Sequence, residues 1–402
     1  MPPSVEAGVP ELCAVISDCI ERSPHRRVTF ATFMELALYH PQQGYYAAQA
    51  GQLGRRGDFV TAAHMGRDFA ELLAVQFVEM WQHLGQPQPF QLVEMGPGQG
   101  LLAGGVLTYL QRWHPDCLAA LHYTLVETSP ALRAAQQQHL APWHPHVTLE
   151  WCELAALPPI TGCLFSNELV DAFPVHLVTL TPRGLQEQYV TLTGDAPRPF
   201  TFVAAAPSTS ALAAYFHQAG IEATCPPYPE GYTTEVNLAA LEWMAQVASK
   251  LHRGYVLTID YGYPADRYYS LARSHGTLQC YTRHAHHNDP LINVGRQDIT
   301  AHVDFTTLQR QGEQQGLETL GCTQQGLFLM ALGLGDRLSA LTQLSGTDSA
   351  TLRYALQQRD TLHQLISPLG LGSFTVLIQG KGLTQPPQKA LQGLTIPPLA
   401  GG

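Results

Sequence analysis

The fold is decided by the stretch Phe90-Gln-Leu-Val-Glu-Met-Gly-Pro-Gly-Gln-Gly100. Its first five residues predict a short buried strand, and the residues that follow it predict a helix over 101–113. Glycines stand at alternate positions of the loop between them, at Gly96, Gly98 and Gly100. A side chain there would forbid the tight turn or block the approach of a ligand to the backbone. The stretch therefore predicts a ligand-binding loop in an α/β fold.

The spacing of these glycines indicates which ligand the loop binds. A dinucleotide fingerprint reads G-x-G-x-x-G, with pyrophosphate at the N-terminus of the helix. Here the loop reads G-x-G-x-G, and Glu94 stands two residues ahead of Gly96. This variant is typical of S-adenosylmethionine sites, in which the methionine part of the cofactor lies over the glycines. The alternative is a glycine turn that packs a helix on a strand and binds nothing.

An acidic residue on the next predicted strand supports a nucleoside site. Glu127 ends the strand over 123–127, where its carboxylate can accept hydrogen bonds from both ribose hydroxyls. Thr128 and Ser129 follow it and join the predicted cofactor site, and Ser129 also suits the N-cap of a helix over 130–140. Since the same acid would suit NAD, Glu127 alone does not choose the cofactor. A nicotinamide-dependent oxidoreductase stays open, although the loop spacing argues against it.

Strands and helices alternate from this loop onwards, which predicts a mostly parallel sheet with right-handed crossovers. The expected strands cover 90–94, 123–127, 147–150, 162–166, 255–260, about 317–324 and 373–379. The expected helices cover 69–84, 101–113, 130–140 and 238–251, and residues 10–40 look helical, with a second short helix from Thr32 to Tyr39. The fold class is therefore α/β, with a Rossmann-like sheet.

The same pass along the chain gives an expected domain organisation. The alternation breaks over 175–235, where two segments alternate like antiparallel strands, so we interpret this part as a β-rich insertion on the substrate side. The expected segments are an N-terminal helical region with a lid loop (1–85), two halves of the core (86–174 and 236–382), the insertion (175–235) and a flexible tail (383–402).

Composition excludes several classes of protein. Of 402 residues, 45% are hydrophobic and 13% charged, which is a globular balance. The net charge is −10 and no run of five basic residues occurs, so no nucleic-acid partner is expected. The acidic balance suits a small molecule or a basic protein substrate.

The cysteines and the N-terminus bear on the cellular compartment. The eight cysteines form no Cys-x-x-Cys pair, which favours reduced thiols in a cytoplasmic protein and no metal site. No apolar run is long enough to span a bilayer, so no membrane insertion is expected. Glu6, Glu11 and Asp18 argue against a signal or transit peptide. We expect a cytoplasmic location.

Five ordered motifs resemble those of the MidA-like family, and the match runs from about residue 28 to 380. They are Asp58-Phe-Val-Thr61, the glycine loop, Phe165-Ser-Asn-Glu-Leu-Val-Asp-Ala-Phe-Pro174, Ile259-Asp-Tyr-Gly-Tyr263 and Asp298-Ile-Thr-Ala-His-Val-Asp-Phe305. The family includes a mitochondrial complex I assembly factor that methylates an arginine of a complex I subunit. The resemblance implies a class I methyltransferase sheet with one late antiparallel strand, extra N-terminal helices and insertions. It also implies S-adenosylmethionine as cofactor and an arginine of a protein, of the respiratory complex I type, as acceptor.

By the same resemblance, Asp58, Phe59 and Thr61 belong to a lid over the cofactor, and nearby glycines would let this loop close. Family members often carry a Ser-Pro pair soon after this segment, whereas this chain continues Thr61-Ala-Ala-His-Met-Gly-Arg67. This departure leaves the local conformation open. His64 is therefore expected to be a surface or core histidine and not a catalytic one.

Three polar residues follow the fourth expected strand and are the candidate catalytic residues. Asn167, Glu168 and Asp171 stand near its carboxyl end, which is where open α/β sheets bind ligands. Carboxylates match the guanidinium fork, so we expect Glu168 first, and Asp171 second, to orient an arginine acceptor. The alternatives are a solvated Glu168 and an Asp171 that caps the turn before Pro174.

Further candidates are weaker. Asp260 and Asp304 could line the acceptor pocket, although Asp304 could equally cap a helix that starts near Thr306. His284, His286 and His287 are expected in an exposed polar loop and not in a metal site.

Other functions stay open from the sequence alone. They include a methyltransferase for a small molecule or another side chain, and a non-catalytic assembly factor that binds the cofactor. A homodimer is considered, but no sequence feature chooses the oligomeric state.

Overall fold

The computed structural model describes residues 8–49, 62–194, 198–224, 227–282, 285–343, 349–383 and 390–396. The chain divides into two compact units, each assembled from separate segments of sequence. The first unit holds Met1–Phe59, Val170–Met244 and Gly262–Gln311, and the second holds Val60–Leu169, Ala245–Tyr261 and Gly312–Gly402. The sequence-based boundaries follow continuous segments, so they do not anticipate that residues 262–311 group with the N-terminal region.

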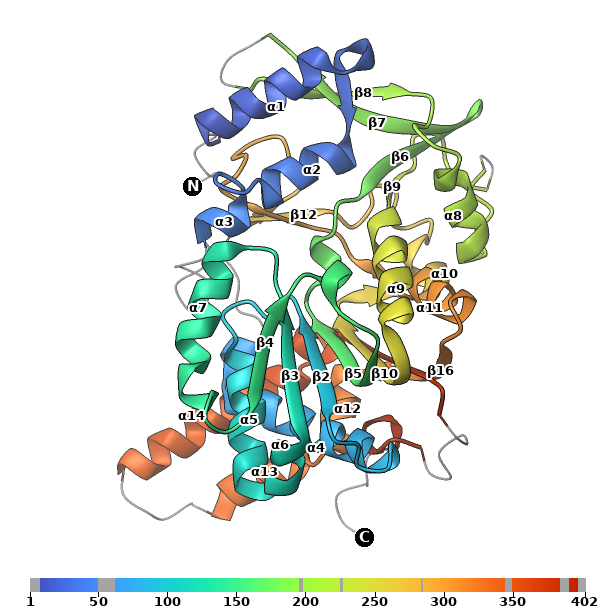
Figure 1. Cartoon of the computed structure of the whole chain (residues 1–402). Helices are drawn as coiled ribbons and strands as arrows, with labels where there is room; N and C mark the ends of the chain where they lie inside the picture. Colours follow the sequence, from blue (N-terminus) through green and yellow to red (C-terminus); the bar gives the residue numbers. More distant parts are fainter. Residues whose placement is uncertain are drawn as a thin grey trace. The chain divides into compact units, whose positions relative to one another are not determined.

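The second unit is built on a seven-stranded sheet in the order β16-β17-β10-β5-β2-β3-β4 (Figure 1). All neighbours pair in parallel except β17, which is antiparallel to both β10 and β16. The predicted sheet, with its single late antiparallel strand, is therefore confirmed. The strands are β2 Phe90–Met95, β3 Leu121–Val126, β4 Thr148–Cys152, β5 Ile160–Asn167, β10 Leu251–Asp260, β16 Glu318–Gln324 and β17 Thr375–Lys381.

Apolar helix faces and strand side chains form the core of this unit. Phe77 on α4 packs against Phe165 on β5 with ring centroids 4.8 Å apart and the ring planes tilted by 45°, and both side chains are fully buried. Burying such rings is the main favourable term in folding. The helices are α4 Arg67–His83, α5 Leu101–Trp113, α6 Pro115–Ala120, α7 Pro130–Leu140, α12 Gln325–Ala331, α13 Leu334–Gln343 and α14 Ser349–Ile366, together with the end of α9 Leu238–Lys250.

The first unit contains the predicted β-rich insertion. A sheet in the order β1-β7-β6-β9, with β8 beside β7, pairs antiparallel throughout. Its strands are β1 Arg27–Thr29, β6 His176–Thr181, β7 Gly184–Leu192, β8 Phe200–Ala205 and β9 Thr233–Val236. The helices are α1 Pro10–Arg22, α2 Phe30–Tyr39, α3 Tyr45–Gln49, α8 Ala211–Ala219 and α10 Ala265–Tyr268, with α11 Phe305–Gln314 running from the first unit into the second.

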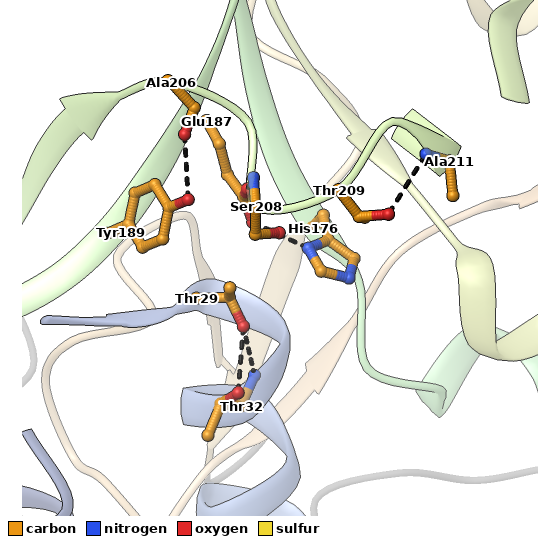
Figure 2. A network of polar contacts seen from close by, with 9 residues as sticks. All are labelled: Thr29, Thr32, His176, Glu187, Tyr189, Ala206, Ser208, Thr209 and Ala211. Carbon is orange, nitrogen blue, oxygen red and sulfur yellow. Dashed lines mark hydrogen bonds and ion pairs between the residues drawn. The ribbon is translucent and has the colours of Figure 1, made fainter. Parts of the chain in front are cut away.

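A buried carboxylate, Glu187, connects this sheet to a neighbouring loop by hydrogen bonds, as Figure 2 shows. Glu187 on β7 faces His176 on β6 at 2.7 Å and also accepts a hydrogen bond of 2.6 Å from the backbone N–H of Ser208. Burial raises the pKa of Glu187, but these two bonds outweigh it and hold the pKa below its ordinary value. The Glu187 carboxylate therefore ties the loop before α8 to the hairpin.

The N-terminal region differs from the expected helical stretch over 10–40. The first helix ends at Arg22, and a short strand, β1, precedes α2. Pro24 explains the break, because proline disfavours helical backbone in the preceding residue and removes a donor. Thr29 then caps α2 by accepting from Thr32 N at 3.1 Å. Within α1 the buried residues Leu12, Ile16 and Ile20 follow one another at four-residue spacing, so this part of the predicted helical stretch is confirmed.

Two expected loops are also structured in part. His286 and His287 lie in β13 Ala285–His287, which pairs with β12 Gln279–Thr282, so the predicted polar loop is wrong for these two residues; His284 lies outside the described residues. Within the predicted tail, Leu391 is buried and Gly393 N donates to Gln76 on α4. The strand β12 also pairs with β14 Asp298–Thr300, and β11 Gly262–Tyr263 pairs with β15 Val303–Asp304.

In the ranges that the structure describes, no helix is long and apolar enough to cross a membrane.

Candidate active site

The glycine loop connects β2 to α5 in the second unit and adopts the conformation that its sequence predicts. Gly96, Gly98 and Gly100 have φ angles of 67°, 54° and 77°, in the left-handed region that favours glycine. A Cβ on Gly96 would lie 2.7 Å from Leu169 Cδ1. A Cβ on Gly98 would meet nothing within 4 Å. The loop therefore lies close to the Leu169 side chain at Gly96 and leaves an open cradle at Gly98, which fits a ligand that lies against the backbone.

Glu127 lies directly after β3, at the same edge of the sheet, because parallel strands end side by side. Its Oε1 accepts from Ser129 N at 2.8 Å, and its Oε2 accepts from Gln136 Nε2 at 3.0 Å. A carboxylate has about four acceptor positions, and the Thr128 backbone also bonds Glu127, so about one position is left for a ribose hydroxyl. Burial raises the pKa of Glu127, and the bonds from Ser129, Gln136 and the Thr128 backbone oppose that rise. Ser129 also caps α7 as predicted, accepting from Leu132 N.

Gln136 was not predicted from the sequence as a site residue; it is fully buried on α7 and donates to both Glu127 Oε2 and Gly98 O. A signal was present, because Gln136 falls in register with Leu132 and Leu140 at four-residue spacing. A polar residue on an otherwise apolar helix face must find partners when it is buried.

Glu94, the acid ahead of the loop, is buried at the end of β2. Its Oε2 accepts a hydrogen bond of 2.7 Å from Tyr123 Oη on β3. Burial raises the pKa of Glu94 to about 8, although the bond from Tyr123 opposes the shift. A cationic group beside Glu94 would favour its ionised form, so this carboxyl suits the ammonium of an amino acid.

Asn167 and Glu168 lie at the carboxyl end of β5, as predicted. Glu168 has a φ of 51°, which is uncommon for a residue other than glycine and is held by its N–H donating to Ile259 O at 2.9 Å. Its Oε1 accepts from Ala62 N at 2.9 Å and from Asn167 Nδ2 at 3.1 Å. The solvated Glu168 that the sequence left open is therefore not what the structure shows.

Asp260 and Asp304, which were expected to line the acceptor pocket, both accept hydrogen bonds from backbone N–H groups. Asp260 is fully buried at the end of β10, and its two oxygens accept from Leu169 N at 3.2 Å and Tyr261 N at 2.9 Å. Asp304 accepts from Thr306 N and Thr307 N, which is the helix cap that the sequence offered as an alternative.

The structure places the remaining candidates as follows. Asp171 is buried in the first unit, where its carbonyl oxygen accepts from Ala301 N. Asp58, Phe59 and Thr61 lie outside the described residues, so their predicted role in a lid stays a prediction. Within the described ranges, no group of three or more His, Cys, Asp or Glu residues could hold a metal ion.

The order of the seven strands, the glycine loop after β2 and the acid after β3 define the class I methyltransferases that use S-adenosylmethionine. Residues 72–323 match the model of a family described as S-adenosyl-L-methionine-dependent methyltransferases. The chain belongs to this family.

Curated relatives and solved structures agree with the assignment. The chain is 30% identical to the Drosophila melanogaster "Protein arginine methyltransferase NDUFAF7 homolog, mitochondrial", over 78% of this chain and 73% of that protein. It is 31% identical to the Mus musculus protein arginine methyltransferase NDUFAF7, over 80% and 74%. A Burkholderia thailandensis protein described as a "likely methyl transferase", solved with S-adenosyl-homocysteine, superposes with a TM-score of 0.82 at 31% identity, covering 97% of each chain.

Proposed function

We propose that this S-adenosylmethionine-dependent methyltransferase methylates an arginine side chain of a protein. The observation that carries the proposal is the group at the carboxyl end of β5, where Asn167 and Glu168 follow a strand beside the glycine loop's own strand. The relatives whose names specify protein arginine methyltransferase support the choice of acceptor. By the resemblance in the motifs, the substrate protein would be a subunit of the respiratory complex I type.

The cofactor side of the site follows from the described contacts. Glu127 would accept from a ribose hydroxyl, the open face of Gly98 would take the methionine part, and Glu94 would receive its ammonium group. When bound, S-adenosylmethionine supplies an electrophilic methyl group. These residues would fix its position, and alignment of reacting groups alone is worth several kcal/mol.

On the acceptor side, Asn167 and Glu168 would hold the guanidinium group. Asn167 Oδ1 is buried and has no hydrogen-bond partner in the part of the chain that the structure describes, so it can accept from an incoming N–H. The Glu168 carboxylate beside it would localise positive charge on the bound nitrogens, which leaves the remaining nitrogen more nucleophilic. The role of Asp171 as a second carboxylate stays a prediction from the sequence. The cytoplasmic location and the homodimer stay predictions.

The acceptor is identified by incubating the full chain with tritiated S-adenosylmethionine and a cell lysate. Label should appear in a protein, and acid hydrolysis should release methylated arginine. Label confined to small molecules, or to another amino acid, would overturn the arginine proposal. An absence of any transfer by folded protein that binds the cofactor would favour the non-catalytic assembly factor.

Variants of Glu168 test the acceptor assignment. Glu168→Gln retains most of the shape and one acceptor oxygen, and is expected to lower methyl transfer by at least tenfold with little change in cofactor affinity. Glu153→Gln, at an exposed position of the second unit, is the control and should leave the rate unchanged. If Glu168→Ala leaves both methyl transfer and acceptor binding unchanged, the assignment is wrong.

A further inference from the structure

Gln136 connects parts of the cofactor site that lie far apart in the sequence. Its Nε2 donates to Gly98 O at 2.7 Å and to Glu127 Oε2 at 3.0 Å, while its Oε1 accepts from Trp151 Nε1 at 3.0 Å. The side chain is fully buried, and all four residues belong to the second unit. One amide therefore joins the glycine loop, the acid after β3 and the strand β4.

Trp151 decides which way this amide points. An indole N–H can only donate, so the atom of Gln136 that faces it must be the carbonyl oxygen. The NH₂ group is then directed to Gly98 O and Glu127 Oε2, both of which can only accept. Each polar atom of the amide has a complementary partner, so the side chain is held in one orientation.

From this geometry we propose that Gln136 is a positioning residue for S-adenosylmethionine, with Trp151 fixing its amide. The inference rests on the proposed contacts of Glu127 and Gly98 with the cofactor. Gln136 does not itself need to touch the cofactor. It acts by holding the carbonyl of the loop's middle glycine and the carboxylate of Glu127 in a fixed relation, because the same NH₂ group binds both.

The arrangement also divides the acceptor positions of Glu127. Ser129 N binds Oε1, Gln136 Nε2 binds Oε2 and the Thr128 backbone supplies a third bond, so about one of the four acceptor positions stays open for a ribose hydroxyl. Without Gln136, the carboxylate would keep only its contacts with Ser129 and Thr128, and the Gly98 carbonyl would lose this donor.

The charge state of Glu127 depends on the same contact. Burial raises its pKa, and the bond from Gln136 is among those that lower it. Arg133 on α7 also lowers this pKa, and its guanidinium donates to Glu127 O at 2.7 Å. On β4, burial raises the pKa of the Cys152 thiol, which keeps it neutral. Removing the amide would therefore raise the pKa of Glu127 further while Arg133 and Cys152 stay in place.

The test compares two fully buried glutamines of the second unit. Gln136→Met retains length and removes the donors, and is expected to raise the Kd for S-adenosylhomocysteine about tenfold, measured by titration calorimetry on the full chain. Gln76→Met is the matched control, because Gln76 bonds Glu79 and Gly393 and not the loop. It should lower thermal stability and leave the Kd within about twofold.

A pH series separates positioning from a general loss of stability. In Gln136→Met, the fall in affinity on acidification should begin at a higher pH than in the wild type, because protonation of Glu127 removes a ribose acceptor. The Gln76→Met profile should overlay that of the wild type.

A folded Gln136→Met protein with wild-type affinity and pH profile would overturn the inference. If that variant does not fold, Trp151→Phe decides, since it removes only the donor that orients the amide; an increase of about threefold in Kd is expected, and an unchanged Kd overturns the inference. Glu127→Gln separates the ribose contact of Glu127 from the positioning role of Gln136. If Glu127→Gln binds S-adenosylhomocysteine with the wild-type Kd, the ribose assignment fails. If Glu127→Gln raises the Kd and Gln136→Met does not, only the positioning role is rejected.

Discussion

Tyr123 Oη on β3 donates a 2.7 Å hydrogen bond to Glu94 Oε2 on β2, so the acid that opens the loop motif is a buried carboxyl with a neutral partner. Burial raises the pKa of Glu94 from 4.5 to about 8. Between pH 4.5 and about 8, Glu94 is therefore protonated in the folded protein and ionised in the unfolded chain.

The first prediction concerns stability against pH. Since the folded pKa is raised, the contribution of protonated Glu94 is fully present below pH 4.5 and is lost as the pH rises to about 8. Thermal unfolding of the ligand-free protein should show this decline, and Glu94→Gln, which cannot ionise, should lack that part of it. Identical pH profiles of the two proteins would show that Glu94 is ionised in the fold.

The second prediction concerns the open face of Gly98. In Gly98→Val the new Cβ meets no protein atom within 4 Å, but the residue is strained by about 1–2 kcal/mol because φ is 54°. We expect at least a tenfold loss of affinity for S-adenosylmethionine in calorimetry, since the new side chain would occupy the cofactor's place. Gly316→Val, at φ 83° with equally open surroundings, should carry similar strain and bind normally. Wild-type affinity in Gly98→Val would refute the argument from the glycine loop.

The third prediction separates two roles for Asp304. Because its carboxylate caps α11, Asp304→Ala should lower the free energy of unfolding by about 1 kcal/mol, whereas Asp304→Asn should retain the cap. Neither variant should change the KM for the methyl acceptor. A raised KM in the stable Asp304→Asn protein would instead place this residue in the acceptor site.

The fourth prediction concerns a charge cluster in the second unit. Arg337 Nη1 lies 2.6 Å from both Asp68 Oδ1 and Glu71 Oε2, and its side chain is 23% exposed. Arg337→Ala leaves Asp68 without this counter-ion and leaves Glu71 with only the more distant Arg67, 3.6 Å away, so we expect a loss of about 3 kcal/mol in chemical denaturation. Arg22→Ala breaks an exposed pair with Asp18 and should cost less than about 1 kcal/mol. Equal effects of the two variants would contradict the prediction.

Much of the second unit could be predicted because its elements carry local signals. The strand, alternate glycines and helix around Gly98 are contiguous, and the periodicity of α4, α5 and α7 reports their buried faces. The first unit was harder, because its parts come from three separate segments and the short strand β1 finds its partner β7 far along the chain.

The roles of single residues could be predicted where their partners are close in sequence, and not where the partners are distant. Ser129 could be read as a helix cap because the cap and its target are three residues apart. For Asp304 the sequence offered a helix cap and a pocket residue, and the structure shows the cap. Gln136 was missed altogether, because its partners Gly98 and Trp151 are distant in sequence.

The sequence by itself determined the sheet class, the glycine loop and the acid after the next strand, since these depend on short-range patterns of turn residues and apolar spacing. Only the tertiary structure decided which buried polar groups meet. The ordering of parallel strands brings Gly98, Glu127 and Trp151 to one glutamine amide. Burial there requires each donor to find an acceptor, and that requirement fixes the site's geometry although no local pattern encodes it.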